Sequence, residues 1–547
     1  MWYDEFSKLT PVPRIWQKHP GFFSLGDAPR VWVAPALRRE LAPAFARFLE
    51  DLADLAACAP AQTEDAAGAG IICDLLPRQV LPAEGYSLRV TSAGAVLAAD
   101  SAAGIRLGLQ TLLQLASFQY RQPNLPCGEI TDWPRYRHRW FMLDLGRAPF
   151  SLPLLKRYVR IAARLKYNGI QLHLYDNELN GCRFRNLPLG SENPFALDLA
   201  AFAELLEYAA GYGVEIIPEL ESWGHAGSIL QHYPALYGAT RLHGRGHSFG
   251  IGPETFDLLG RIYGEWLDIL PDGSWFHVGL DEANWCLLPG ADPAVYQRFN
   301  LVRQIYTLAG EEAARRGKRI RFAMWHDHKI KNMDQYIPRD LWPEVVTMPW
   351  NYHDKASIER QLAAFTVREA KMYLPDGRLR RPFIACSGAS GFHEVGAARA
   401  TYWWSTLADA MPNCIGLNVA AWATNDPDRT LFSLFAGADC AWNPEGARSV
   451  LGETLPQDDA YGMIAMAMRH WQRRFPDADP KALEKESQPS VMHGIHRWGD
   501  RYLETVAPHW MPATPRLGDQ SDTEAPAMSA DAPDVDQVDA TMGDEGN

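Results

Sequence analysis

The sequence lacks any long apolar run, and its start is no exception. Residues 1–18 instead carry charged side chains, at Asp4, Glu5, Lys8, Arg14 and Lys18, where a secretory signal needs an uninterrupted apolar stretch. No later run is long enough to span a bilayer. We therefore expect a cytoplasmic protein with no membrane partner, or a secreted one whose signal has been trimmed.

Positive charge is also scarce. The 547 residues include 53 lysines and arginines against 66 aspartates and glutamates, for a net charge of −13. An acidic surface does not attract nucleic acid or anionic lipid. The composition thus argues against a nucleic-acid partner and favours a neutral or basic small ligand. It leaves a homodimer open as the assembly.

The cysteines show no pairing pattern. There are eight of them, none in a C-x-x-C motif: Cys58, Cys73, Cys127, Cys182, Cys286, Cys386, Cys414 and Cys440. Disulfide frameworks and zinc sites have tighter, repeated spacings. We expect free thiols in a reducing compartment.

What is present suits a large globular protein. With 47% hydrophobic and 22% charged residues, the chain can bury a sizeable core. The pattern predicts a small α/β accessory domain at 1–132, a catalytic barrel at 133–443, helices at 444–510 and an acidic tail at 511–547. Within the first domain it predicts helices at 37–55 and 101–115 and a hairpin of 86–90 and 95–98, and after the barrel a helix at 493–506. The tail has few large apolar residues to offset its ordering entropy, so we expect it to be disordered.

The central part alternates short apolar runs with amphipathic segments. The runs are 140–145, 169–174, 214–220, 275–280, 320–325, 345–350, 383–386 and 415–422. Helical spacing of apolar residues follows the first and fourth runs, at 152–165 and 295–309. Eight such units predict an α/β fold with a closed (β/α)8 TIM barrel.

Polar and aromatic side chains follow these runs, at the strand ends where barrel enzymes carry their working groups. They are Arg147, Asp176, Glu219, Glu221, His225, Asp281, Glu282, Trp325, Asp327, Trp350, Tyr352, Trp422 and Asp426. Aromatic faces stack on sugar C–H groups and charged groups bind hydroxyls. The set therefore predicts a pyranose site, in a lectin or a glycosidase.

The adjacent pair Asp281 and Glu282 indicates how such a site could react. Retaining enzymes with their own nucleophile place two carboxylates about 5 to 5.5 Å apart, across the sugar. Neighbouring residues rarely do so, but they can serve a substrate that supplies its own nucleophile. Asp281 would then orient a 2-acetamido group, and Glu282 would act as general acid and base. Taken alone, the pair could also be a solvated strand end.

Other candidates have structural alternatives. Arg147 could simply pair with Asp144, and His225 could be a packing histidine. The tryptophans could fill the core, although three at successive strand ends favour a stacking cage. His326 and His328 suggest a metal site, but Asp327 between them would point the other way on a strand and no third ligand is near, so we favour a structural role.

Four motifs occur in a recognisable order. Residues 277–282 read HVGLDE, similar to H-x-G-G-D-E, and 142–147 read MLDLGR, similar to M-L-D-x-x-R. Residues 166–176 resemble K-x-N-x-x-x-x-H-L-x-D, and 218–226 resemble P-E-I-D-x-P-G-H-A. By these motifs the chain resembles glycoside hydrolase family 20 over nearly its whole length.

The resemblance implies roles for the site residues. Asp281 would polarise the acetamido group and Glu282 would be the acid/base. Arg147 would bind the 3- and 4-hydroxyls, with Asp176 and His225 in a network around the acid. The remaining roles concern the pocket walls: Trp325, Trp350 and Trp422 would enclose the sugar, and Tyr352 would donate to the acetamido oxygen. No cofactor is implied.

The sequence departs from the family pattern at three places. Leu280 replaces the second glycine of H-x-G-G-D-E, and Gln171 replaces a histidine of the second-strand motif. Thr424 stands where a carboxylate often reads the outer hydroxyls, so Asn425 or Asp426 would take that role. The choice between gluco and galacto sugars is therefore open.

The function expected is that of an exo-acting β-N-acetylhexosaminidase. It would hydrolyse terminal β-linked GlcNAc, GalNAc or both, with retention, by substrate-assisted catalysis; its partner is a glycan or amino-sugar substrate. The alternatives are a carbohydrate-binding protein that has lost catalysis and a metal-dependent barrel hydrolase.

Overall fold

The structure is a computed structural model. It describes residues 8–77, 80–117, 124–191, 193–236, 248–250, 252–281, 301–326, 337–352, 354–367, 371–388, 394–422, 427–451 and 457–487. All of these lie in one compact unit, residues 1–506.

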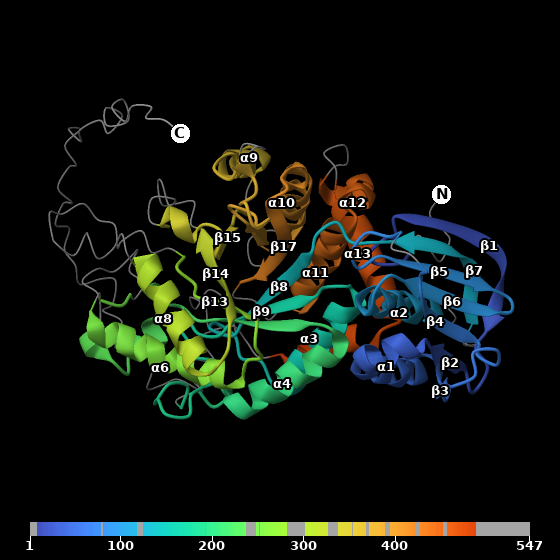
Figure 1. The fold of residues 1–547 in the computed structure, drawn as a ribbon, viewed down its shortest axis with the longest axis horizontal. Helices are drawn as coiled ribbons and strands as arrows, with labels where there is room; N and C mark the ends of the chain where they lie inside the picture. The colour runs from blue at the N-terminus through green and yellow to red at the C-terminus, as the bar shows by residue number, and fades with distance from the viewer. Residues whose placement is uncertain are drawn as a thin grey trace. The chain divides into compact units, whose positions relative to one another are not determined.

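The first part of the chain forms a seven-stranded mixed sheet with two helices (Figure 1). In sheet order the strands are β1 (Ile15–Ser24), β7 (Asn124–Asp132), β5 (Tyr86–Thr91), β6 (Gly94–Ala99), β4 (Ile71–Leu75), β2 (Arg30–Val33) and β3 (Ala61–Thr63). The helices are α1 (Pro35–Ala56) and α2 (Ala102–Ala116). The predicted hairpin is β5–β6, which pairs antiparallel.

Almost all residues of helix α2 are buried, because the helix packs against this sheet. It begins after Ser101, whose hydroxyl accepts a hydrogen bond from the Gly104 amide and so satisfies one of the amides left open at a helix start. Helices α1 and α2 also contact helices of the barrel, so they lie between the sheet and the barrel (Figure 1).

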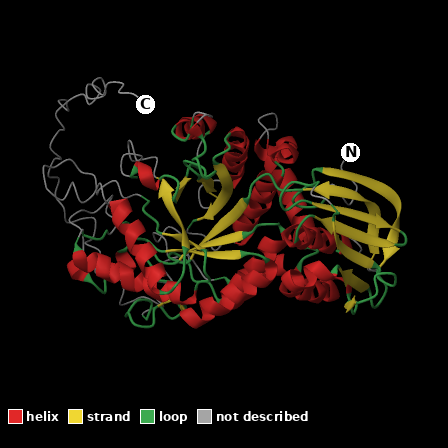
Figure 2. Cartoon of the chain, in the orientation of Figure 1, coloured by secondary structure: helices red, strands yellow, loops and turns green. Residues whose placement is uncertain are grey.

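Eight parallel strands close into a barrel, seen as the central group of yellow arrows in Figure 2. They are β8 (His138–Asp144), β9 (Gly169–His173), β12 (Glu215–Glu219), β13 (Ser274–His277), β14 (Ile320–His326), β15 (Val345–Pro349), β16 (Phe383–Gly388) and β17 (Cys414–Ala421). A small parallel pair, β10 (Cys182–Arg183) and β11 (Leu197–Asp198), lies in the loop after β9.

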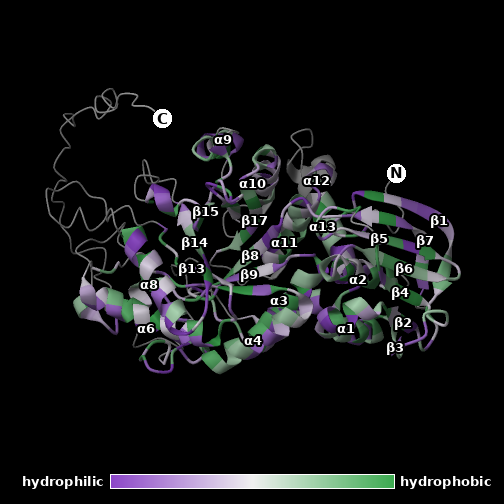
Figure 3. Cartoon of the chain, viewed as in Figure 1, coloured by the Kyte–Doolittle hydropathy of each residue, from purple (hydrophilic) through white to green (hydrophobic). Residues whose placement is uncertain are grey.

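The described helices of the barrel and of the segment after it follow in chain order. They are α3 (Leu152–Arg164), α4 (Leu199–Tyr212), α5 (Gly227–Leu230), α6 (Pro253–Ile269), α8 (Leu301–Arg315), α9 (Lys355–Ala363), α10 (Glu394–Leu407), α11 (Pro427–Trp442), α12 (Pro444–Leu451), α13 (Gln457–Gln472) and α14 (Pro480–Glu486). Helices such as α4 and α8 carry hydrophobic and hydrophilic residues along their length (Figure 3), as expected for helices with one face on a core.

The barrel strands are buried on both faces, as in β8, all of whose residues are buried. Their outward side chains pack under the helices. Inward side chains fill the barrel, among them Trp140, Met142, Trp275 and Met348. The barrel interior is therefore a packed core, and only the strand ends are open for chemistry.

The predicted fold class is confirmed. Each of the eight apolar runs coincides with a barrel strand, and the helices expected at 37–55, 101–115 and 152–165 are α1, α2 and α3. Part of the helix expected at 295–309 appears as α8. The helix expected at 493–506 and the acidic tail lie outside the described residues.

Two further expectations concern membranes and thiols. Within the described part of the chain, no helix combines the length and the apolar character needed to cross a membrane. Seven of the eight cysteines are described, and all seven are free thiols: Cys58, Cys73, Cys127, Cys182, Cys386, Cys414 and Cys440.

Candidate active site

The predicted site residues that the structure describes lie at the carboxyl ends of the barrel strands. Arg147 follows β8, Asp176 follows β9, His225 follows β12 and Asp281 follows β13. The aromatic candidates belong to the later strands: Trp325 is in β14, Trp350 and Tyr352 follow β15, and Trp422 follows β17. Glu282, Asp327 and Asp426 lie outside the described residues.

Arg147 is held by carboxylates on two sides. Its guanidinium lies 3.0 Å from Asp144 and 2.5 Å from Asp176, and Glu178 lies 3.5 Å from its Nε atom. The pairing with Asp144 that the sequence left open as an alternative is therefore present. Because Arg147 also reaches Asp176, it is part of the same network as the other candidates.

His225 connects this arginine to Asp281. Its Nδ1 atom lies 3.1 Å from Asp176, and its Nε2 atom lies 3.6 Å from Asp281. Burial alone would raise the pKa of Asp176, but Arg147 and His225 outweigh burial and hold the pKa of this carboxyl well below its usual value. Asp176 is therefore an anion that contacts both Arg147 and His225.

His173 forms a second branch of the network. Its ring nitrogens lie 2.8 Å from Asp176 and 3.2 Å from Glu219. Burial would lower the pKa of His173, but these carboxylates raise it to about 10. Burial would raise the pKa of Glu219, but His173 and His277 lower it to about 2. His173 and Glu219 are thus a buried ion pair.

Gln171 takes part in this branch despite replacing the expected histidine. Its amide donates to Glu219 over 2.7 Å and accepts from Asn418 over 2.8 Å. Trp325 donates to the other oxygen of Glu219 over 2.5 Å. The carboxylate of Glu219 is therefore saturated with donors, and the glutamine preserves one of them.

Glu221 and Asp281 form a pair of neighbouring acids. Both carboxyls are buried, and Glu221 accepts a hydrogen bond from the Leu280 amide over 3.3 Å. Burial, and then the charges of Asp281 and Glu219, raise the pKa of Glu221 well above its usual value. The pKa of Asp281 is raised too, again mainly by burial, with His225 opposing the shift. Both pKa shifts favour the protonated form of these two neighbouring carboxyls.

The turn between β13 and Asp281 explains one glycine of the signature. Gly279 has a φ of +66°, and a Cβ atom there would lie 2.1 Å from a carboxyl oxygen of Glu221. Leu280, the departure from the family pattern, also adopts a positive φ of +76°, a conformation that costs a non-glycine residue about 1 to 2 kcal/mol. Its side chain is buried in the core, which offsets part of that cost.

The aromatic candidates form a continuous wall. Trp325 and Trp422 have ring centroids 5.8 Å apart, and Trp350 stacks on Tyr352 at 5.3 Å. The indole of Trp422 donates to the hydroxyl of Tyr352 over 2.6 Å, which directs the tyrosine's own proton away from Trp422. Trp325 is fully buried, whereas Tyr352 and Trp422 are only partly buried. The last two thus offer the most accessible ring surface.

One group of side chains has the composition of a metal site. His173, Glu219 and Glu221 bring ligand atoms within 4.8 Å of one another. However, both nitrogens of His173 face carboxylates, and its raised pKa of about 10 keeps the ring protonated, whereas a metal ligand needs a neutral imidazole. These residues fit a proton-sharing network better than a metal-ion site.

The second metal candidate was the pair His326 and His328. His326 packs edge-on against Phe365 at 4.8 Å, and His328 lies outside the described residues.

Sequence reasoning missed Glu178 and the roles of His173 and Glu221. Glu178 follows Asp176 by two residues, where a strand-end loop gives no periodic signal. Burial and the charge of Asp176 raise the pKa of Glu178 to about 7. Perturbed carboxyls of this kind cluster at functional sites. Only the fold reveals that this one faces Arg147.

A closed parallel barrel with acids, an arginine and aromatic rings at its carboxyl end is the architecture of a carbohydrate-active barrel hydrolase. The family model for glycosyl hydrolase family 20, catalytic domain, matches residues 136–444, and the model for domain 2 of the same family matches residues 7–133. The chain belongs to glycosyl hydrolase family 20 and carries its catalytic domain.

Curated relatives include beta-hexosaminidases of bacteria. The chain is 25% identical to a beta-hexosaminidase of Porphyromonas gingivalis over 64% of its length and 48% of the relative's. It is 31% identical to one of Akkermansia muciniphila over 41% of its length and 51% of the relative's. The chain thus spans about half the length of these relatives.

Solved structures support the fold. The N-acetyl-beta-hexosaminidase of Streptomyces plicatus in complex with Thio-NAglucal has a TM-score of 0.64 at 20% identity, covering 86% of this chain and 95% of that one. The beta-N-acetylhexosaminidase of Bacteroides fragilis gives a TM-score of 0.63 at 20% identity, covering 86% and 96%. At this identity the likeness concerns the architecture.

Proposed function

We propose that the protein is an exo-acting β-N-acetylhexosaminidase that hydrolyses terminal β-linked GlcNAc or GalNAc with retention, through the acetamido group of its substrate. The observation that carries the proposal is the placement of Asp281. It is a buried carboxyl in the turn after β13, 3.6 Å from His225, and the chain position after it is an acid.

In this mechanism the acetamido oxygen attacks C1 while the glycosidic bond breaks. Asp281 accepts the acetamido N–H and stabilises the positive charge of the cyclic intermediate. Burial raises the pKa of this carboxyl, and His225, 3.6 Å from Asp281, opposes the shift and so favours the charged form. Glu282 protonates the leaving oxygen and then takes a proton from the water that opens the intermediate.

The other site residues would bind the sugar. Arg147 would bind the 3- and 4-hydroxyls, while Asp176 holds its guanidinium. Trp350 and Trp422 would stack on the ring, with Trp325 buried behind them, and Tyr352 would donate to the acetamido oxygen. We assign the outer hydroxyls to Asn425 or Asp426, and Asp327 is a further substrate-binding candidate; a substrate panel decides between gluco and galacto sugars.

The test is turnover of a 4-nitrophenyl β-N-acetylglucosaminide by Glu282→Gln. Loss of a general acid/base lowers kcat by about 10²- to 10⁴-fold, and we expect a loss in this range. Glu254→Gln, which changes an exposed acid at the start of α6, should leave kcat unchanged. Full activity of Glu282→Gln would refute the proposal.

A second outcome would favour the competing function. If the wild-type chain binds N-acetylglucosamine in a calorimeter but hydrolyses none of the aryl GlcNAc, GalNAc or sulfated GlcNAc substrates, it is a carbohydrate-binding protein.

Three expectations remain predictions of the sequence: the domain boundaries at residues 132, 443 and 510, a homodimeric assembly, and a cytoplasmic location.

A further inference from the structure

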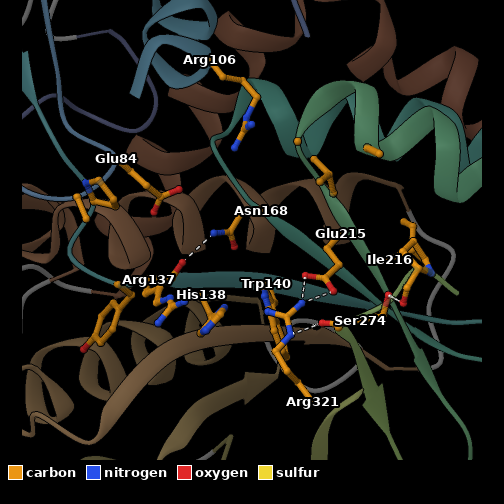
Figure 4. A pocket seen from close by; sticks show the side chains of 18 of the residues that line it. Glu84, Arg106, Arg137, His138, Trp140, Asn168, Glu215, Ile216, Ser274 and Arg321 are labelled. Atoms are coloured by element: carbon orange, nitrogen blue, oxygen red, sulfur yellow. Dashed lines mark hydrogen bonds and ion pairs between the residues drawn. The ribbon is translucent and has the colours of Figure 1, made fainter. Parts of the chain in front are cut away.

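A cavity of about 940 Å³ lies at the end of the barrel opposite to Asp281. Residues at the amino-terminal ends of four barrel strands line it: His138 of β8, Glu215 of β12, Ser274 of β13 and Arg321 of β14 (Figure 4). Glu84 and Arg106 of the first domain complete the wall. Its volume is in the range of small-molecule sites, and its position separates it from the candidate active site.

Charged side chains of both signs face this cavity. The arginines are Arg106, Arg135, Arg137 and Arg321, and the acids are Glu84, Glu215 and Asp272. Glu215 is bound to Arg321 through contacts of 2.5 and 2.7 Å, drawn as dashed lines in Figure 4. This pair is therefore neutral overall.

The other two acids are also neutralised. Glu84 binds Arg139 through contacts of 2.8 and 3.1 Å, and Asp272 binds Arg319 over 2.7 Å. Both partners lie outside the cavity wall, so each of these acids forms its ion pair with an arginine that does not line the cavity.

The arginines that line the cavity are not all paired with a carboxylate among the described residues. Arg135 is paired with Asp409. For Arg106 and Arg137, the described part of the chain provides no carboxylate within ion-pair distance. Among the described residues, these two guanidinium groups therefore have no direct ion pair, although the charges of Glu84 and Glu40 act on Arg106. Figure 4 shows the Arg106 side chain directed into the cavity.

The fold positions the side chain of Arg106 and the backbone at Arg137. Arg106 lies against Gly213, where a Cβ atom would meet its Nε atom at 2.1 Å, so only a glycine at the end of α4 allows this placement. Asn168 holds the Arg137 segment by donating to the Arg137 carbonyl over 2.8 Å and accepting from the Arg139 amide over 2.9 Å. Pre-positioned donors reduce the entropy lost on binding.

His138 does not change this balance. Burial, and then the neighbouring Arg137 and Arg321, lower the pKa of His138 to about 3. Its ring is neutral at pH 7 and packs edge-on against Trp140 at 5.4 Å.

We propose that this cavity is a binding site for a small oxyanion, a phosphate or carboxylate group of a low-molecular-weight ligand, held by Arg106 and Arg137. Guanidinium groups bind both kinds of oxyanion through paired N–H donors. The site joins the first domain to the base of the barrel, so its ligand would stabilise their contact. It does not depend on the proposed hydrolase activity.

The test is thermal unfolding of the full chain with sodium phosphate or sodium malonate, at an ionic strength held constant with sodium chloride. We expect a saturable rise in Tm with at least one of the two, and the stronger of them identifies the source of the oxyanion. Arg106→Lys and Arg137→Gln should each raise the half-saturating concentration at least tenfold. The exposed Arg39→Gln, on α1 and away from the cavity lining, is the matched control.

Either of two results would overturn the proposal. One is the absence of any saturable shift with either anion; the other is a shift that persists unchanged in both cavity variants. Turnover of the aryl N-acetylglucosaminide separates folding from binding, because Arg137 is exposed and Arg137→Gln should keep wild-type kcat while losing the anion response.

Discussion

At the scale of single residues, the candidate site holds more acid than base. Asp144, Asp176 and Glu178 surround Arg147, so one guanidinium faces three carboxyls. Burial and the charge of Asp176 raise the pKa of Glu178 to about 7. This carboxyl beside Arg147 thus changes its charge near neutral pH.

Glu178 gives a prediction about stability and pH. Its folded pKa is raised above that of the unfolded chain, so the folded state binds more protons between about pH 4.5 and 7 and loses stability as the pH rises through that range. Glu178→Gln removes this loss. Urea unfolding should show the variant gaining stability relative to wild type on going from pH 5 to pH 8.

The exposed Glu254→Gln serves as control for Glu178→Gln and should show no such trend. A difference between Glu178→Gln and wild type that stays constant with pH would contradict the assignment of the titration to Glu178.

At the scale of elements, the turn after β13 decides where Asp281 lies. Gly279→Ala would add a Cβ atom 2.1 Å from Glu221 to a residue with φ of +66°. Gly317→Ala has nearly the same φ, +65°, with nothing within 4 Å of the added atom. Both variants therefore place an alanine at a strained positive φ. Only Gly279→Ala also brings the added Cβ atom into collision with Glu221.

For this pair we expect Gly317→Ala to cost about 1 kcal/mol of unfolding free energy and to keep kcat. Gly279→Ala should cost more and should lower kcat at least tenfold, because Glu221 must move and Asp281 with it. Urea unfolding and aryl-glycoside turnover measure both effects. Equal behaviour of the two variants would contradict the role given to the turn.

The helices and strands could be predicted from the sequence because their signals are local. The barrel strands are short apolar runs, and α2 begins after a serine cap. The four motifs likewise indicated Arg147, Asp176, His225 and Asp281. The raised pKa values of Glu221 and Glu178 could not be predicted, because burial is the largest cause of both and depends on the tertiary fold. Leu280 departs from the family pattern, and the sequence did not reveal that it adopts a positive φ.

At the scale of the whole molecule, one buried ion pair joins three parts of the chain. Lys166, which precedes β9, donates to Asp132 at the end of β7 over 3.0 Å and to the Tyr86 hydroxyl over 2.8 Å. Its ammonium also lies 4.3 Å from the ring centroid of Trp442 in α11. The Lys166 side chain thus connects the barrel to the first domain and to the last barrel helix.

Lys166→Met should leave Asp132 buried without its counter-charge. Breaking such a pair costs about 3 to 5 kcal/mol, and we expect a loss near the lower value because Tyr86 and Trp442 still donate to Asp132. Lys156→Met removes the exposed pair with Glu204 and should cost less than about 1 kcal/mol. Urea unfolding of the two variants tests this; equal losses would show that the junction adds little.

The central claim is that the acetamido group of the substrate is the nucleophile and that Asp281 orients it. The most direct measurement compares kcat/KM of the wild-type chain for 4-nitrophenyl β-N-acetylglucosaminide and 4-nitrophenyl β-glucoside, which differ only at the 2-position. We predict at least a thousandfold preference for the acetamido sugar, equivalent to about 4 kcal/mol of transition-state stabilisation. Comparable values for the two substrates would contradict the claim and would require a nucleophile from the protein.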